Sequence, residues 1–64
     1  MNRIKYFRKQ VYLTQEELAK KSGVSLASIS AYERGIRNPK IENLRKLANV
    51  LRTQPLFLED SNEA

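Results

Sequence analysis

The chain has 64 residues, a length at which a single hydrophobic core only just offsets the entropy lost on folding. It contains no Cys and no His, which excludes disulfides, thiolate or imidazole metal sites and the usual nucleophile and base pairs of enzymes. The formal charge of +5 lies in residues 1 to 40, where nine Lys and Arg face three acidic residues, a distribution that fits either a polyanionic partner or a well-solvated surface.

The N-terminal segment is predicted to form the first helix. Ile4, Phe7 and Val11 are spaced at i, i+3 and i+7, as on one face of a helix. Charged residues run through "MNRIKYFRKQVYL", so it cannot be the apolar core of a signal peptide. No apolar run in the chain approaches the roughly 20 residues that span a bilayer. We therefore expect a cytoplasmic protein that does not enter a membrane.

The second and third helices have clear start and stop signals. Thr14 is followed three residues later by Glu17, which is the pattern of a capping box. Gly23 supplies the left-handed residue that ends a helix of about two turns. Ser25 can cap a third helix that runs to about residue 34, where Gly35 stops it.

The last two predicted helices follow prolines. Pro39 cannot occupy a helix interior, so a fourth helix should start near it. Its apolar stripe consists of Ile41, Leu44, Leu47, Ala48 and Leu51. Pro55 suits the first turn of a short fifth helix over residues 56–58, and the polar tail 59–64 is expected to fray.

The third helix has an unusual outward face. At 100° per residue, Ile29 and Tyr32 share the buried side, with Val24 just before them. The opposite face holds Leu26, Ala27, Ser30, Ala31 and Arg34. A helix facing only water would carry Lys, Glu or Gln there, whereas small uncharged side chains permit close approach. Three surroundings fit this face: a protein partner, the floor of the DNA major groove, or burial on most sides within the domain.

The residues from Leu13 to Leu51 resemble a known family. A two-turn helix, a short turn with Gly23 and a second helix with a small exposed face make a helix-turn-helix. "LTQEELAKKSGVSLASISAYERGIRNPKIENLRKLANVL" is similar to the phage repressor and Cro-like helix-turn-helix family, over about residues 3 to 58. The resemblance implies an all-α, compact five-helix bundle like that of lambda repressor, with a DNA-binding domain at 1–58. It also implies a nucleoid-associated regulator of bacterial or phage origin, most often a repressor.

Carried over by position, the resemblance also implies a set of site residues. The DNA-binding positions are Gln15, Ser25, Leu26, Ala27, Ser28, Ser30, Ala31, Arg34, Arg37, Asn38 and Lys40. Gln15 is expected to bond a phosphate and to brace the third helix. Arg8 and Glu33 match a structural ion pair found in some relatives, against the alternative of two separately solvated side chains. The expected partner is double-stranded DNA, with no metal, cofactor or small-molecule substrate.

Several positions depart from the family pattern. Tyr12 stands where Gly or Asn is common, and because a bulky residue is strained in the left-handed region we expect this turn to differ. Lys40 replaces a small capping residue, which leaves Asn38 as the expected cap of the fourth helix. Leu56 and Phe57 add apolar surface that either forms a homodimer contact or repacks into the core. A dimer would require a pseudo-palindromic operator with half-sites about 34 Å apart.

This sequence pattern is compatible with functions of different classes. The leading hypothesis is a DNA-binding transcriptional regulator, and the main alternative is an antitoxin or adaptor whose third helix docks on a protein. Enzymatic activity is not expected, since no acid and base pair shares a pocket. RNA binding lacks exposed aromatic residues to stack on bases, because Tyr6 and Tyr12 are expected in the core or at its edge.

Overall fold

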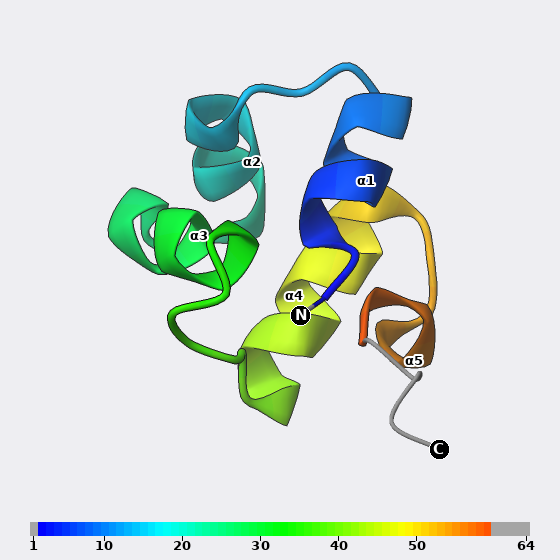
Figure 1. Ribbon diagram of the computed structural model, residues 1–64. Helices are drawn as coiled ribbons and strands as arrows, with labels where there is room; N and C mark the ends of the chain where they lie inside the picture. The colour runs from blue at the N-terminus through cyan, green and yellow to red at the C-terminus, as the bar shows by residue number, and fades with distance from the viewer. Residues whose placement is uncertain (1, 60–64) are drawn as a thin grey trace.

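The computed structural model describes residues 2–59 and contains five helices. These are α1 (Ile4–Gln10), α2 (Gln15–Ser22), α3 (Leu26–Glu33), α4 (Ile41–Leu51) and α5 (Pro55–Leu58). α2 packs on α3 and α4, α1 crosses α3 and α4, and α5 folds back on α4 (Figure 1). The all-α five-helix prediction is confirmed. No helix among the described residues is long and apolar enough to cross a membrane.

The local signals around α2 act as predicted. The Glu17 amide donates to Thr14 Oγ1 at 3.0 Å, and the Thr14 amide donates to Glu17 Oε1 at 2.8 Å. This capping box satisfies two amides that the first helical turn leaves free. Gly23 ends α2 with φ +79°, and Ser25 Oγ then accepts the Ser28 amide at 3.1 Å to start α3. Hydrogen bonds between residues close in sequence and the left-handed Gly23 therefore set the short turn between α2 and α3.

One core ties all the helices together. Each helix contributes one side chain that is fully buried, and these are Ile4, Leu18, Ile29, Leu47 and Leu58. Val24, Tyr32, Leu44, Ala48 and Leu51 complete the cluster. Because a domain of this size has little apolar area to spare, removal of one helix would expose core side chains of the helices packed on it. The position of α3 therefore depends on α1 and α2, which pack against it.

The start of α4 differs from the prediction. Lys40, not Asn38, is the N-cap residue, and its side chain makes no capping hydrogen bond because an ammonium group cannot accept one. Ile41 was expected in the buried stripe but is 55% exposed. It occupies the first position of the helix, ahead of the turn where the burial of α4 begins at Leu44. The other members of the predicted stripe are buried.

The turn after α1 also differs from the prediction. Tyr12 adopts the left-handed conformation, with φ +60°, and its ring is 91% exposed. The Leu13 amide donates to the Arg8 carbonyl and the Tyr12 amide to the Lys9 carbonyl, a Schellman arrangement that requires a left-handed residue here. The expectation of a different turn was therefore wrong. Tyr6 is also exposed, at 59%, so neither tyrosine lies in the core.

The two ends of the described chain meet beside α1. The Arg3 amide donates to the Leu58 carbonyl at 2.8 Å, and Asn2 forms an isolated antiparallel bridge with Glu59. These contacts close the bundle at the end where α5 returns to α1. The predicted polar tail begins at Glu59, and residues 60–64 lie outside the described part of the chain.

Candidate nucleic-acid interface

The outward face of α3 is partly open to solvent. Ile29 and Tyr32 are the buried residues of this helix. Leu26 is 40% exposed, and Ala27 is exposed one position further on. Ser28, Ser30 and Ala31 are half-buried. Of the three surroundings considered for this face, burial on most sides within the domain is therefore wrong. In Figure 1, α3 lies at the left-hand edge of the bundle, on the side away from α5.

Two of the serines on this helix already have partners. Ser25 Oγ accepts the Ser28 amide and also donates to Ser28 Oγ at 2.9 Å. The Ser25 hydroxyl proton is therefore used within the cap. Ser28 keeps its own hydroxyl proton, as does Ser30, so the face offers two single donors that can turn toward a ligand. Its remaining outward side chains before Arg34 are apolar.

The segment after α3 gathers positive charge and amides. Arg34, Arg37, Asn38 and Lys40 are all exposed. All but Arg34 border an open groove of about 390 Å³, which is lined by Tyr32, Arg37, Asn38, Lys40, Glu42 and Asn43. Cations and amide donors at the rim of a groove suit an anionic ligand, with the Glu42 carboxylate as the one opposing charge in this lining.

Tyr32 organises this segment. Its ring lies under the Arg37 guanidinium, with 5.9 Å from Cζ to the ring centroid. Its hydroxyl accepts a hydrogen bond from Asn43 Nδ2 at 2.9 Å, which connects it to the first turn of α4. Because the Tyr32 ring is buried in the core, the cation–π contact holds Arg37 close to the end of α3.

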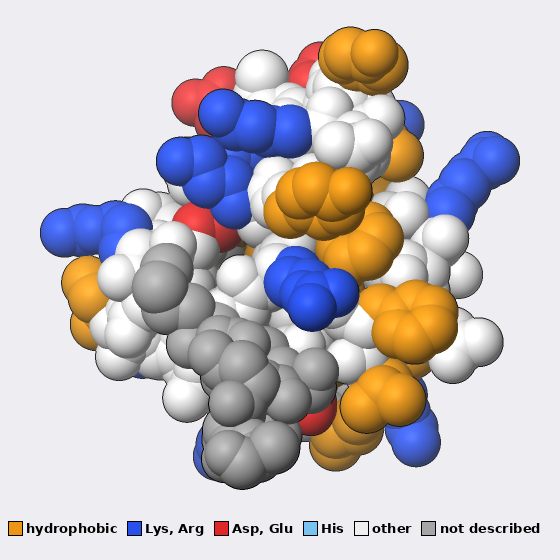
Figure 2. All heavy atoms as spheres, turned by 45° about the vertical axis from the view of Figure 1, so that its right-hand side comes forward, with side chains coloured by type: hydrophobic (Ala, Val, Ile, Leu, Met, Phe, Trp, Pro, Cys, Tyr) orange, Lys and Arg blue, Asp and Glu red, His pale blue; other side chains and the backbone are white. Residues whose placement is uncertain are grey.

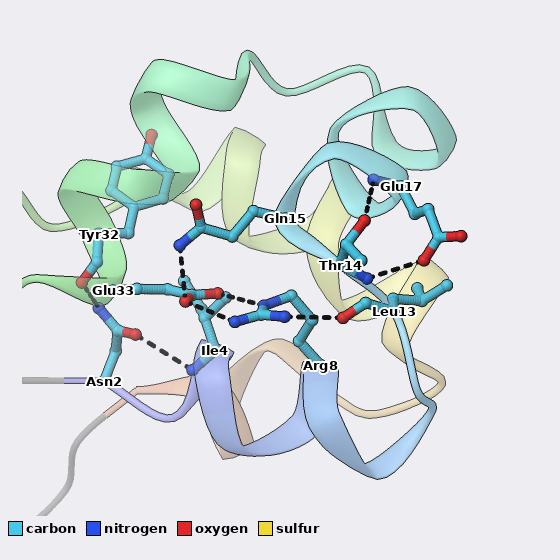
Figure 3. A network of polar contacts seen from close by, with 9 residues as sticks. All are labelled: Asn2, Ile4, Arg8, Leu13, Thr14, Gln15, Glu17, Tyr32 and Glu33. Carbon is cyan, nitrogen blue, oxygen red and sulfur yellow. Dashed lines mark hydrogen bonds and ion pairs between the residues drawn. The ribbon is translucent and has the colours of Figure 1, made fainter.

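A buried ion pair fixes the other side of α3. Arg8 Nε lies 2.6 Å from Glu33 Oε2 and Arg8 Nη2 lies 3.0 Å from Oε1, so the pair is bidentate (Figure 3). The side chains of Arg8 and Glu33 are only 10% and 3% exposed. Arg8 Nη1 also donates to the Leu13 carbonyl at 2.7 Å. The two side chains are not separately solvated, and the pair joins α1 to the end of α3.

Gln15 completes this network from the start of α2. Its Nε2 donates to Glu33 Oε1 at 2.9 Å, so Gln15 braces α3 as the family resemblance implied. Burial raises the pKa of Glu33, but hydrogen bonds from Arg8 and Gln15 and the Arg8 charge lower it more, so the carboxyl pKa lies below its ordinary value. The hydrogen bond to Glu33 raises the pKa of Arg8. Both groups are therefore charged when the domain is folded at neutral pH.

Asn2 is a further residue that positions α3. Its Nδ2 donates to the Tyr32 carbonyl at 2.9 Å, and its Oδ1 accepts the Ile4 amide at 3.1 Å (Figure 3). One side chain therefore satisfies the first amide of α1 and anchors the last turn of α3. Neither Asn2 nor Tyr32 was predicted from the sequence as a positioning residue. The only local signal was an Asn two residues before the first apolar helix position, which is a weak capping pattern.

A second exposed surface lies on the opposite side of the molecule from α3. Figure 2 brings forward the right-hand side of Figure 1, where α5 lies, and hydrophobic side chains gather over one half of this face. Leu56 and Phe57 are 64% and 49% exposed. Repacking of these two side chains into the core is therefore wrong, and Leu58 is the α5 residue that enters it.

The described residues hold no group of side chains typical of a metal site. Among residues 2–59, no cluster of three or more His, Cys, Asp and Glu could hold a metal ion. The buried charged pair Arg8 and Glu33 is saturated by hydrogen bonds within the domain.

Comparison with known proteins identifies the fold. Residues 4–58 match the model of a helix-turn-helix family. The chain is 38% identical to an uncharacterised HTH-type transcriptional regulator of Methanocaldococcus jannaschii, over 97% of each chain.

Two solved structures are also similar. The N-terminal DNA-binding domain of SinR from Bacillus subtilis has a TM-score of 0.87 and 36% identity, covering 97% of this chain and 91% of that one. The crystal structure of SinR, the master regulator for biofilm formation, in complex with DNA has a TM-score of 0.81 and 38% identity, covering 84% and 87%.

Proposed function

The chain belongs to the Cro/C1-type helix-turn-helix family of transcriptional regulators, and we propose that it binds its DNA sites by inserting the exposed face of α3 into the major groove. This family consists of DNA-binding proteins and not of enzymes. One observation carries the proposal: small, uncharged side chains, the exposed Ala27 and the half-buried Ala31, lie on α3 shortly before the exposed cations Arg34, Arg37 and Lys40. A major groove about 12 Å wide admits such a helix.

The proposed contacts divide into two groups. Leu26, Ala27, Ser28, Ser30 and Ala31 face the base edges, with Ser25 at the start of the helix. Arg34, Arg37, Asn38 and Lys40 bind phosphates along the neighbouring backbone, as does the start of α2 at Gln15. Phosphate contacts position the protein, whereas contacts to base edges select the sequence. Since Gln15 also holds Glu33, it can connect a phosphate contact to the orientation of α3.

We further propose that two copies bind one pseudo-palindromic operator and repress transcription from it. Leu56 and Phe57 support this proposal, because they are exposed apolar side chains next to each other on a short helix. They lie on α5, away from α3, so a contact there leaves the reading face free (Figure 1). A pseudo-palindromic operator requires the two recognition helices of such a dimer to face the same side of the duplex, about 34 Å apart.

The proposal is tested by selecting bound duplexes from a random DNA pool and measuring their affinity by fluorescence anisotropy. Ala27→Glu places a carboxylate on the reading face, and Asn49→Glu places the same charge on an exposed position of α4. We expect Ala27→Glu to abolish specific binding and Asn49→Glu to weaken it only slightly. Equal effects of the two variants would contradict insertion of α3.

The salt dependence of the same binding provides a second criterion. The logarithm of the affinity falls linearly with the logarithm of the salt concentration, and each phosphate that the protein neutralises makes the magnitude of this slope larger by about 0.9. With Arg34, Arg37 and Lys40 on the backbone, we expect a slope of about 3 or more for each protomer. A slope close to zero, together with no selected duplex, would favour the alternative of a protein-interaction module.

A further inference from the structure

The reading face of α3 lacks the side chains that usually identify bases. Arg and Lys pair with guanine, and Asn and Gln with adenine, but none of these lies between residues 26 and 31. The Ser25 hydroxyl proton is held by Ser28. Besides the single hydroxyl donors of Ser28 and Ser30, the helix presents apolar groups: the Leu26 side chain, 40% exposed, the exposed Ala27 and the half-buried Ala31.

An apolar face of this kind matches one feature of the major groove. The C5 methyl group of thymine is the largest apolar group that a base pair presents there, beside the hydrogen-bond donors and acceptors of the base edges. A Leu or Ala side chain against a donor or acceptor would desolvate it without replacing its hydrogen bond, which is costly. Against a methyl group the same side chain gains from burial.

The charges around this face favour DNA over a protein groove as its occupant. Lys20 and Lys21 are exposed in the last turn of α2, just before the turn that leads into α3. Arg34, Arg37 and Lys40 are exposed just after it. The apolar face is thus bordered by cations at both ends of the helix. A duplex offers the complementary arrangement, since apolar methyl groups lie on the groove floor between two phosphate backbones.

We propose that α3 recognises its operator mainly through C5 methyl groups, so that its ligands are duplexes with thymine at the positions facing Leu26, Ala27 and Ala31. This inference rests on the proposed insertion of α3 into the major groove. 5-Methylcytosine presents the same methyl group at the same place. Methylation of a cytosine at one of these positions therefore raises affinity relative to unmethylated cytosine.

The test replaces thymine by uracil, which removes the methyl group and keeps base pairing intact. A duplex selected from the random pool is synthesised with thymine or with uracil at each T·A pair in turn, and the dissociation constants are compared. Loss of one buried methyl contact corresponds to about a fourfold weaker affinity. We expect this loss at two or more positions in each half-site. Changing the same positions to cytosine and then to 5-methylcytosine should recover a similar factor.

Variants of the protein assign the effect to α3. Leu26→Ala removes exposed methyl groups from the partly exposed side chain that begins the helix. The loss of affinity on replacing thymine by uracil should therefore become smaller at one base position. Lys40→Ala is the matched control, because its side chain makes no capping hydrogen bond and is proposed to contact phosphate. It should weaken thymine and uracil duplexes by the same factor.

The outcomes separate this inference from the function on which it rests. If no duplex is selected from the pool, the proposed function fails. If a selected duplex binds equally well with thymine and with uracil at every position, DNA binding stands and recognition through methyl groups is refuted. If replacing thymine by uracil weakens binding equally in wild type and in Leu26→Ala at every position, the assignment of methyl recognition to this face of α3 is also overturned.

Discussion

The buried ion pair allows a prediction of stability with a defined magnitude. Glu33→Gln removes the negative charge and leaves the Arg8 guanidinium buried, with its side chain only 10% exposed. The new amide also turns a donor toward Arg8 or Gln15, both of which are donors to Glu33 in the folded domain. Breaking a buried pair by removing one partner costs about 3–5 kcal/mol. Because a glutamine can still accept one hydrogen bond, we expect a loss of about 3 kcal/mol in the free energy of unfolding.

Urea and thermal denaturation followed by far-UV circular dichroism measure this loss. For a domain of this size, about 3 kcal/mol corresponds to a melting temperature lower by about 12–24 °C. Glu16→Gln is the control, because Glu16 is an exposed glutamate on α2, and it should change stability by no more than about 0.5 kcal/mol. A loss for Glu33→Gln as small as that of the control would refute the role given to the pair.

A double substitution separates the loss of the pair from the cost of an unpaired charge. Arg8→Met combined with Glu33→Leu replaces two buried charges by apolar side chains of similar length. Such replacements of buried ion pairs are often neutral or stabilising. The double variant should therefore be more stable than Glu33→Gln alone. If it is less stable, the pair itself contributes more than the avoided cost of an unpaired Arg8.

Three further predictions concern the pH dependence of stability, the turn at Tyr12 and the apolar surface of α5. The pKa of Glu33 is lower in the folded domain than its unfolded value of about 4.3, so the ionised carboxylate contributes stability above that value and loses it as the pH falls through the folded pKa. In urea titrations, the difference in the free energy of unfolding between wild type and Glu33→Gln should therefore be constant above about pH 6 and should narrow below about pH 4. Tyr12→Gly should raise the free energy of unfolding by about 0.5–1 kcal/mol, since it relieves the left-handed tyrosine, and a destabilised variant would contradict this reading of the turn. Phe57→Glu should leave the fold unchanged but convert two-copy binding of the operator to single-copy binding in sedimentation experiments, whereas unchanged stoichiometry would exclude α5 as the dimer contact.

The parts of the fold that the sequence predicts are those set by neighbouring residues. The Thr14 and Glu17 capping box, the left-handed Gly23 and the Ser25 cap each depend on atoms within a few positions. The burial of Ile29 and Tyr32 follows from helical periodicity alone. These features define the helix-turn-helix before any tertiary contact is considered.

The parts that could not be predicted depend on the backbone conformation at a helix end, on where a helix begins relative to the core, or on residues distant in sequence. Tyr12 takes a left-handed conformation because the carbonyls at the end of α1 require it, and exposure of its ring avoids any clash. Ile41 has the right spacing for the core, but the first turn of α4 extends beyond the residues that could cover it. The Asn2 contact with the Tyr32 carbonyl joins residues 30 positions apart, and no sequence pattern predicts it.

The DNA-contacting role of the outward side chains is a prediction from the pattern and the family. The structure places Leu26 and Ala27 on an exposed face and Arg34, Arg37 and Lys40 beside it. That arrangement is the geometric condition for groove binding. The role of Leu56 and Phe57 in dimerisation is likewise a prediction. Their exposure is the condition for a contact between two copies of the chain.

The most direct test of α3 insertion is a nuclear Overhauser experiment on the protein bound to a selected duplex, with methyl-labelled alanine. Ala27 and Ala31 lie on the reading face, whereas Ala19 and Ala48 pack in the interior and serve as internal controls. We expect cross-peaks from the Ala27 and Ala31 methyl groups to base protons in the major groove, and none from Ala19 or Ala48. A complex in which Ala27 and Ala31 show no cross-peak to any base would contradict the account.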